Sequence, residues 1–464
     1  MNLVLTPKQR YTAGQQRRKD MRRLAHAAWP VKLRKMEPLE LLKHSMLGRV
    51  PALISLKYER MAESPYSFFR GAVPVMAYDL SILPNTGLMN QICGDAHIRN
   101  LGAFAAPDGR LVFDINDFDE TVRAPFEWDV KRLATSLVLA ARHGGSSVHA
   151  DLEAAEVFLG SYCHSIQSLQ EMTVIDIAHF QVHRLRGVKP VSLLISKAER
   201  ATPLHTLETL TQTVSSRDHV KHGKAGSKHA RKRVPRELAS SLHRGQPAER
   251  VFKSAPPLLD RVTGKTAQDV LDSLIPYRES LQPERRHFLD LYKPVDVAFK
   301  VVGTGSIALR DYCIYLEGNG PGDPLFLQIK EERESAYAPY LKLSPASAQH
   351  QGHRVVDGQR AMQLQSDPFL GWTSIDGRDY LVRQLNDHKA SLDIEDLSNS
   401  RLKAYASICG EILARGHARA GDACALAGYL GKSGRFEQSI VKFASSYANQ
   451  TERDWKELVR RRKK

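Results

Sequence analysis

The chain has 464 residues, 42% hydrophobic and 25% charged, which is ordinary for a globular protein of two or three lobes with substantial cores. No run approaches the roughly twenty apolar residues of a membrane span, and the N-terminal apolar stretch is too short for a secretory signal. Five scattered cysteines argue against a disulfide scaffold or a zinc site and favour a reducing, cytoplasmic location. The net charge of +16 indicates an anionic partner, either a nucleotide or a nucleic acid.

The positive charge is concentrated in two stretches. Residues 1–36 hold ten Lys or Arg against one Asp, and residues 216–236 hold eight against one Asp. Neither stretch has aromatic residues regularly interleaved with the basic ones, as a base-stacking surface would. We expect residues 1–36 to be a basic, frayed N-terminal extension and residues 216–236 to be a solvated basic insertion. Both should lie away from the acidic site described below, so any nucleic-acid binding would be non-specific and electrostatic.

Helical patterns dominate the first part of the chain. The segment 37–48, EPLELLKHSMLG, predicts a short amphipathic helix, and 125–145, which is apolar on most faces, predicts a buried one. A further helix is expected at 149–172, whereas 185–260 indicates loops with short helices. Residues 37–290 are therefore predicted to form a mainly helical lobe.

An acidic segment, Cys93–Thr121, stands out in this basic chain. Asp95 is followed five residues later by Asn100, and Asp117 follows an apolar run, LVFDI, that predicts a strand. A turn at AAPDGR would make a hairpin and bring Asn100 and Asp117 together. In phosphoryl transfer one Asp orients a hydroxyl nucleophile, while an Asn and a second Asp hold Mg²⁺ on the ATP phosphates. Asp and Asn are also common turn residues, so the spacing alone carries little weight.

Further side chains of suitable charge lie near these three in the sequence. The auxiliary candidates are Arg70, His97, Asp114 and Asp119. Arg70 has the charge to pair with a phosphate or with one of the carboxylates, and a surface ion pair is its alternative role. Asp114 or Asp119 would add a ligand to a site for Mg²⁺ or Mn²⁺ made of oxygen atoms.

The pattern changes from helix to strand at about Val295. Alternating, β-branched residues predict a strand, a glycine loop, a second strand, a turn at GNGPGDP and a third strand that ends at Lys330. The loop, Gly303-Thr-Gly305-Ser306, joins two antiparallel strands like the glycine-rich loop of kinases, in which a strand lysine contacts the α- and β-phosphates of ATP. Glycines are also frequent in hairpin turns, and the alternative for Lys330 is an edge-strand lysine in water.

Three more elements complete a β-rich nucleotide-binding lobe over residues 291–390. They are helices at 331–343 and 353–365 and a strand at 379–387. No glutamate in these helices has the position of the kinase helix glutamate that pairs with the strand lysine. Residues 391–464 predict helices that return to the first lobe.

With these motifs in view, the chain resembles the bacterial family catalogued as domain of unknown function 2252, over roughly Glu37 to Lys456. The resemblance rests on long motifs, among them SPYSFFRGA, CGDAHIRNLGAF, VFDINDFDET, PFEWDVKRLATSL, KVVGTGSIALR, HRVVDGQRAMQ and ILARGHARAGD. The family name confers no activity, but the family is similar to the protein-kinase-like superfamily, which includes the aminoglycoside and choline kinases.

Those enzymes carry a catalytic loop of the form His-Gly-Asp-x-His-x-x-Asn. GDAHIRN matches it at Gly94, Asp95, His97 and Asn100, with Cys93 in place of the leading His. Their following Ile-Asp-Phe/Trp motif is similar to the run at Asp117, and Asp129, twelve residues later, would be a structural anchor for the loop. The resemblance implies Asp95 as catalytic base, Asn100 and Asp117 as Mg²⁺ ligands, Lys330 as phosphate clamp, and Gly303, Gly305 and Ser306 as the phosphate loop.

The order of the parts departs from the superfamily, because the glycine loop and lysine follow the catalytic loop here. The segment Ile412–Ala420, ILARGHARA, resembles the helix that in kinase-like enzymes runs straight into the catalytic loop. Joining Ala420 to Gly94 would restore the conventional order. We therefore expect an α+β, protein-kinase-like, two-lobed fold that is circularly permuted, with the catalytic-loop lobe first and the glycine-loop β lobe second. In such a fold Lys330 lies within about 10 Å of Asp117.

The leading hypothesis is a phosphotransferase that uses ATP and Mg²⁺ on an acceptor that the sequence does not identify. Transfer of AMP on the same scaffold is the alternative that the absent helix glutamate leaves open. A nucleotide-binding pseudokinase or regulatory module is a second class. A basic nucleic-acid-associated protein whose acidic cluster holds a structural metal is a third. The sequence gives no indication of oligomeric state.

Overall fold

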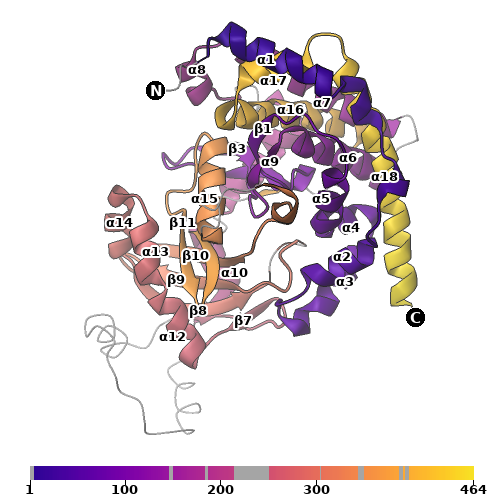
Figure 1. Cartoon of the computed structure of the whole chain (residues 1–464). Coiled ribbons are helices and arrows are strands. Elements are labelled where there is room, and N and C mark those ends of the chain that lie inside the picture. The colour runs from indigo at the N-terminus through magenta and orange to yellow at the C-terminus, as the bar shows by residue number, and fades with distance from the viewer. Residues whose placement is uncertain are drawn as a thin grey trace.

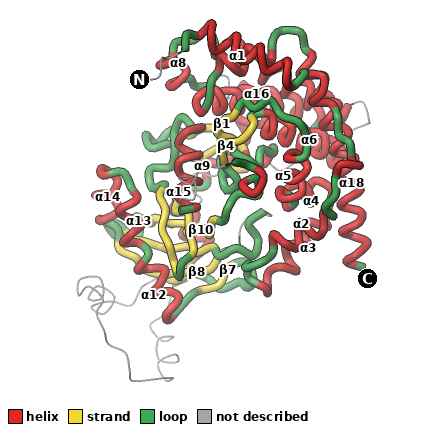
Figure 2. The backbone as a smooth tube through the Cα atoms, viewed as in Figure 1, coloured by secondary structure: helices red, strands yellow, loops and turns green. Residues whose placement is uncertain are grey.

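The computed structural model describes residues 5–145, 150–182, 187–213, 250–301, 303, 305–342, 350–385, 390–391 and 397–463. It is a mixed α+β structure in which a mainly helical part lies beside a six-stranded antiparallel sheet (Figure 1). The tube view separates the same two parts, with most helices on one side and most strands on the other (Figure 2). No helix among the described residues is long and apolar enough to cross a membrane.

The helical part is built around one buried helix, α6. The long helices that pack together here are α6 (Glu127–His143), α7 (Ala150–Leu169), α16 (Asn399–Ala420) and α18 (Arg435–Arg462). Every residue of α6 from Glu127 to Ala141 is buried, as its apolar sequence predicts. A glycine permits close approach between α16 and α7, since a Cβ at Gly410 would lie 2.5 Å from the Phe158 carbonyl oxygen.

Shorter helices surround this bundle. They are α2 (Pro38–Ser45), α3 (Ile54–Ala62), α4 (Pro65–Gly71), α5 (Val73–Ser81), α8 (Val174–His179), α9 (Lys189–Arg200) and α17 (Ala423–Leu430). Helix α10 (Pro203–Leu210) instead packs against the large sheet. The predicted helix at 37–48 corresponds to α2. The predicted short helices within 185–260 correspond to α9 and α10. Helices from the C-terminal 391–464 lie against those from the N-terminal half, so distant parts of the chain share one core.

The N-terminal stretch is folded over its described residues 5–36, for which the expectation of a frayed extension is wrong. Helix α1 (Pro7–Asp20) begins with a capping box between Thr6 and Gln9. It packs against α17, and a Cβ at Gly428 would lie 2.0 Å from a carbonyl oxygen of α1. Several arginines are used internally: Arg18 donates to the carbonyls of Gly428 and Tyr429, Arg23 to that of Leu430, and Arg34 pairs with Asp79 and Asp454.

Two small sheets frame the acidic segment. One pairs β1 (Met89–Ile92) with β4 (Val122–Pro125), and the other has the order β13-β2-β3, with β2 (Leu101–Ala105), β3 (Leu111–Ile115) and β13 (Ala390–Ser391). The antiparallel β2–β3 pair is the predicted hairpin, with Leu101 opposite Ile115. A third small sheet pairs β5 (Thr211–Thr213) with β6 (Arg250–Phe252).

The large sheet has the strand order β11-β12-β10-β9-β8-β7. Its strands are β7 (Leu259–Arg261), β8 (Lys293–Lys300), β9 (Asp311–Glu317), β10 (Pro324–Glu332), β11 (Gly371–Ile375) and β12 (Arg378–Gln384). One face packs on α12 (Gly264–Asp272), α13 (Leu274–Ser280) and α14 (Pro283–Asp290), through apolar residues such as Leu327 and Ile329 of β10. Since side chains alternate along a strand, Lys330 points to the other face. Helix α15 (Gln351–Met362) packs against β10, β11 and β12.

The predicted helix at 331–343 does not form over the described residues 331–342. Instead β10 continues to Glu332, and only a single 3₁₀ turn follows at Ala338–Tyr340. The reason is pairing with neighbours: Glu331 accepts hydrogen bonds from Arg310 and Arg378, which lie at the ends of the flanking strands. These contacts override the helix propensity of the glutamates.

Other sequence expectations have simple outcomes. All five cysteines are buried free thiols. The basic run at 216–236 lies outside the described residues.

Candidate active site

A cavity of about 500 Å³ lies where the helical part meets the sheet. Its walls come from the α2–α5 region, the β1–β2 loop, the turn after β3, the β8–β9 loop and the residues after β10. Nine of the residues singled out from the sequence line it: Arg70, Asp95, His97, Asn100, Asp117, Asp119, Gly303, Gly305 and Ser306. Lys330 is bonded to the Asp119 carboxylate in the cavity wall.

The β1–β2 loop carries Asp95, and its conformation depends on Asp129 of α6. The Asp129 carboxylate accepts hydrogen bonds from the backbone N–H groups of Cys93 and Gly94, at 2.8 and 2.9 Å. Gly94 has a φ of +80°, and a Cβ there would lie 2.2 Å from the Glu120 carbonyl oxygen, so this position requires glycine. The prediction that Asp129 anchors the loop is confirmed.

The last turn of α16 reaches the same anchor. His417 Nε2 lies 3.4 Å from Asp129 Oδ2, and its Nδ1 lies 2.8 Å from the Tyr162 hydroxyl. The carbonyl of His417 accepts a hydrogen bond from the Asn90 side chain on β1, at 3.1 Å. The expectation that this helix runs toward the Asp95 loop is confirmed.

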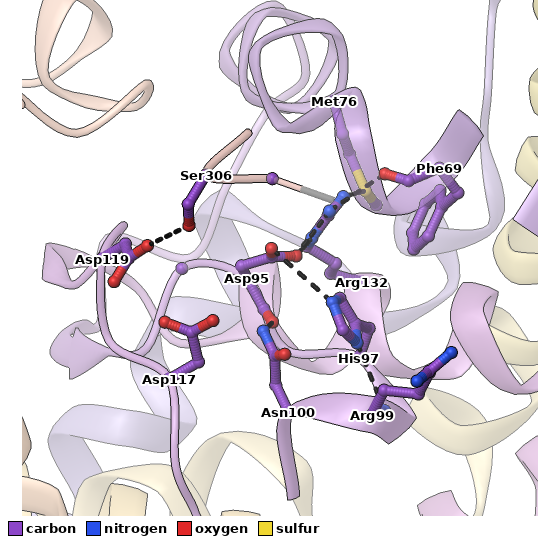
Figure 3. Close-up of polar contacts among 12 residues, drawn as sticks. Phe69, Met76, Asp95, His97, Arg99, Asn100, Asp117, Asp119, Arg132 and Ser306 are labelled. Carbon is purple, nitrogen blue, oxygen red and sulfur yellow. Dashed lines mark hydrogen bonds and ion pairs between the residues drawn. The ribbon is translucent and has the colours of Figure 1, made fainter. Parts of the chain in front are cut away.

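Asp95 is held by one fixed cation. Arg132 of α6 donates from Nε to Asp95 Oδ1 at 2.6 Å, and it is itself fully buried and bonded to the Phe69 carbonyl. His97 Nε2 lies 3.7 Å from the other Asp95 oxygen (Figure 3). Burial raises the pKa of Asp95 to about 6, although Arg132 acts to lower it. Burial lowers the pKa of His97, so its ring is neutral. Asp95 is therefore a carboxyl group that ionises near neutral pH, as a general base requires.

The β2–β3 hairpin brings Asn100 and Asp117 together, as the sequence predicts. The backbone N–H of Asn116 donates to the Asn100 carbonyl at 2.9 Å, which closes the hairpin beside Asp117. Asn100 Nδ2 donates to the Asp95 carbonyl, also at 2.9 Å. Asp95, Asn100 and Asp117 consequently lie beside one another (Figure 3).

Lys330 is buried on β10 and contacts the turn after β3. Its Nζ is bonded to Asp119 and lies 3.7 Å from Asp117 Oδ1. Ser306 of the glycine loop donates to the same Asp119 carboxylate at 3.1 Å. Burial alone would lower the pKa of Lys330, but Asp117 and Asp119 raise it above its usual value. Lys330 conversely brings the pKa of Asp119 below its usual range, against the effect of burial. The expected proximity of Lys330 and Asp117 is confirmed.

The carboxylates at this place fit a magnesium ion. Asp117 Oδ1 and Asp119 Oδ1 are buried and make no hydrogen bond to any described residue. Carboxylate and amide oxygens are the ligands that Mg²⁺ prefers, and it commonly takes only one or two carboxylates plus phosphate oxygens. No group of three or more His, Cys, Asp or Glu within the described ranges is arranged to hold a metal by itself. The donor set therefore suits a metal that shares its coordination with a bound phosphate.

One auxiliary candidate lies elsewhere. Asp114 pairs with Arg415 of α16 inside a separate cavity of about 220 Å³, and both side chains are 4% exposed. It is thus committed to joining β3 and α16 and is not a neighbour of the Asp117 site. Arg70, by contrast, is mostly enclosed at the main cavity, and its Nε has no partner among the described residues. A surface ion pair does not describe it.

Sequence reasoning missed several charged residues of this site, and Glu332 is one of them. Glu332 lies two positions beyond Lys330 on the same face of β10, is buried, and lines the cavity. Burial raises its pKa well above the usual value, and its Oε1 has no partner among the described residues. Strand alternation is the signal that would have found it, had the segment been assigned to a strand.

Helix α15, in which the sequence offers no glutamate, presents an arginine. Arg354 of α15 donates to the carbonyls of Asp119 and Thr121, at 2.8 and 2.5 Å. Lys330 takes its carboxylate partners from the turn after β3 instead of from α15. Two more cations, Arg49 and Lys57, contact the glycine loop from the helical part.

Residues 49–461 match the model of a family described as "Uncharacterized protein conserved in bacteria (DUF2252)". No curated protein and no solved structure matches the chain.

Proposed function

The chain belongs to the DUF2252 family, and we propose that it is a phosphotransferase with a circularly permuted protein-kinase-like fold that acts on ATP. The observation that carries the proposal is the convergence of Lys330 and Asp117, whose charged atoms lie 3.7 Å apart although 213 residues separate them in the chain. A strand lysine, a metal-binding Asp and a catalytic Asp around one cavity are the parts that phosphoryl transfer uses.

The arrangement of the sheet supports this proposal. In kinases a glycine-rich loop joins two strands, a third strand carries the lysine, and a helix follows it. Here β8 and β9 flank the glycine loop, β10 carries Lys330, and α15 follows. The end of α16 also lies against β1, since a Cβ at Gly421 would be 2.0 Å from Asn90 Oδ1. A circularly permuted chain would show this contact, because the end of the helix would lie next to the catalytic loop in space although the two are far apart in the sequence.

The side chains have distinct roles in this proposal. Asp95 would take the proton of the acceptor hydroxyl as its oxygen bonds to the γ-phosphorus, while the bond from phosphorus to the ADP oxygen breaks and ADP leaves. Lys330 would bind phosphate oxygens, and backbone N–H groups at Gly303 and Gly305 would approach the phosphates closely. Magnesium would be held by Asn100 and Asp117, with Asp119 beside them, and when bound would neutralise charge on the phosphates.

One observation favours adenylyl transfer as the second candidate. Lys330 has no glutamate partner on α15, where Arg354 lies instead. The lysine and the triphosphate could therefore be arranged differently from those of ordinary kinases.

Calorimetry of Mg·ATP binding tests the proposal. We expect wild-type protein to bind Mg·ATP, Asp117→Asn to weaken the affinity about tenfold or more, and Asp108→Asn, at an exposed turn, to leave it unchanged. Equal affinity in wild type and Asp117→Asn would mean that Asp117 does not hold the metal. No nucleotide binding by wild type would overturn the proposed function.

A further inference from the structure

The loop between β8 and β9 is held from outside its own sheet. Lys57 on α3 donates to the Gly305 carbonyl at 2.5 Å, across 248 residues of sequence. Arg49 donates to the Ile307 carbonyl at 2.8 Å and to that of Gly305 at 3.3 Å. The backbone N–H of Val50 donates to the Ala308 carbonyl at 2.7 Å. The segment that begins at Arg49 therefore docks directly on the glycine loop.

Lys57 is buried and Arg49 is partly buried, and neither has an ion-pair partner among the described residues. Lys57 is 2% exposed, and no carboxylate of any described residue lies within ion-pair distance of it or of Arg49. Their hydrogen-bond partners are carbonyl oxygens, which carry no net charge. An ammonium group has three donors, and the structure gives Lys57 one acceptor among the described residues.

Two other buried cations of this region provide the contrast. Lys330 is bonded to Asp119, and Arg132 to Asp95. A buried charge without a counter-ion is costly, and proteins ordinarily pair such groups. Lys57 and Arg49 have no such partner in the described part of the chain, and because both line the 500 Å³ cavity beside the glycine loop, an anion that arrives there with a ligand could pair with them.

We propose that Arg49 and Lys57 form a phosphate-binding site that completes the glycine loop from the helical side. The ligand is a phosphate group, because two cations beside loop backbone suit several anionic oxygens on one centre. The phosphate belongs either to a nucleotide polyphosphate or to a free phosphate or phosphomonoester. Only the first of these sources rests on the proposed function.

Binding of three probes tests the site. Calorimetry without Mg²⁺ compares ATP, pyrophosphate and inorganic phosphate on wild type, Lys57→Met, Lys57→Arg and the control Lys43→Met, whose lysine is 78% exposed on α2. We expect Lys57→Met to weaken binding about tenfold or more, Lys57→Arg to retain most of it, and Lys43→Met to match wild type.

Thermal melting without ligand separates ligand binding from a structural role. Because Lys57→Met removes a buried amino group that has no ion-pair partner among the described residues, its melting temperature should equal or exceed that of wild type. A lower melting temperature together with unchanged affinity in the folded protein would show that Lys57 only holds the loop and would overturn the site.

The probes also separate this inference from the proposed function. If wild type binds pyrophosphate or phosphate through Lys57 but does not bind ATP, the site stands and the nucleotide function falls. If ATP binds equally to wild type and Lys57→Met, the function stands and the site falls. If wild type binds none of the probes, the site is wrong.

Discussion

At the scale of single residues, Asp95 shows how burial and one fixed cation set the state of a candidate base. Burial favours the neutral carboxyl, and the guanidinium of Arg132 favours the carboxylate, so the pKa settles at about 6. Arg132 cannot move away, because it lies under Phe69 and donates to the carbonyl of that residue. Asp95 is thereby ionised at cellular pH and close enough to its pKa to accept a proton.

This state predicts a pH dependence. As pH rises through about 6, Asp95 loses its proton and becomes able to act as base, so kcat/KM should rise about tenfold per unit below that pH and level off above 7. Asp95→Asn should lower kcat by a factor of about 10² to 10⁴ and keep ATP affinity. Steady-state kinetics from pH 5 to 9 measure both. A flat profile, or full activity in the variant, would remove Asp95 from the catalytic role.

The ion pairs of Lys330 lead us to expect that substitutions of Lys330 and Asp119 have coupled effects on stability. Lys330→Met would leave Asp117 and Asp119 without their cation and should lower the free energy of unfolding by about 3 kcal/mol. Adding Asp119→Asn should restore part of that loss, because fewer buried charges then stay unpaired, but should not restore ATP binding. Urea unfolding of the wild type, the two single variants and the double variant measures this coupling. Simple additivity would show that the ion pair has no energetic role.

The grouping of the candidate site residues could be predicted in part from the sequence. Asp95, Asn100 and Asp117 share one short segment, so local spacing and one hairpin place them together. The roles of Arg49 and Lys57 could not be predicted, because they bind backbone carbonyls of the glycine loop, which lies about 250 residues away in the sequence. A lysine or arginine that binds distant backbone carbonyls has no sequence motif that would identify it.

At the scale of elements, close contacts through glycine join the two ends of the chain. Helix α1 meets α17 where Gly14 faces the Ala425 carbonyl and Gly428 faces that of Tyr11, each with room for no Cβ. This packing docks a basic N-terminal helix onto the fold, although Gly14 is the one buried residue of α1. Charge composition suggested the opposite, because the sequence shows how many arginines there are but not which of them turn inward.

The contact predicts the effect of a small substitution. A Cβ at Gly428 would lie 2.0 Å from the Tyr11 carbonyl oxygen, so Gly428→Ala should lower the free energy of unfolding by about 2 kcal/mol. Gly160→Ala on α7 is the matched control, because nothing lies within 4 Å of its Cβ and alanine is the better helix former. Chemical denaturation of both variants decides the matter. Equal stability of wild type and Gly428→Ala would contradict this packing of α1.

Elements whose apolar residues repeat with one clear period could be predicted from the sequence. Segments whose pattern fits both helix and strand could not. The apolar helix α6 and the strands on either side of the glycine loop follow their patterns. The segment after Lys330 did not, because EERES has helix formers while cross-strand partners for Glu331 decide its conformation. These cross-strand partners come from distant parts of the chain, so a short window of the sequence does not contain them.

At the scale of the whole molecule, the net charge of +16 affects which partners the protein attracts. Not every basic side chain contributes to the surface, since Arg34 pairs with Asp79 and Asp454 in the interior. Six acidic residues line the cavity, so a polyanion such as DNA would meet carboxylates there as well as cations.

Nucleic-acid binding should accordingly be weak and dependent on salt. We expect fluorescence anisotropy with a random duplex to show binding at 50 mM salt that falls at least a hundredfold by 200 mM, with no preference among sequences. Tight, sequence-selective binding at physiological salt would instead favour a nucleic-acid-associated protein over a nucleotide enzyme.

The most direct test of the central claim is to follow the label of ATP. Purified full-length protein is incubated with Mg²⁺, fractionated bacterial metabolites and proteins as acceptors, and ATP labelled on either the γ- or the α-phosphate. The account predicts transfer of γ label by wild type, a loss of at least a hundredfold in Asp95→Asn, and no transfer of α label. Transfer of α label, or nucleotide binding with no transfer of either label, would contradict it.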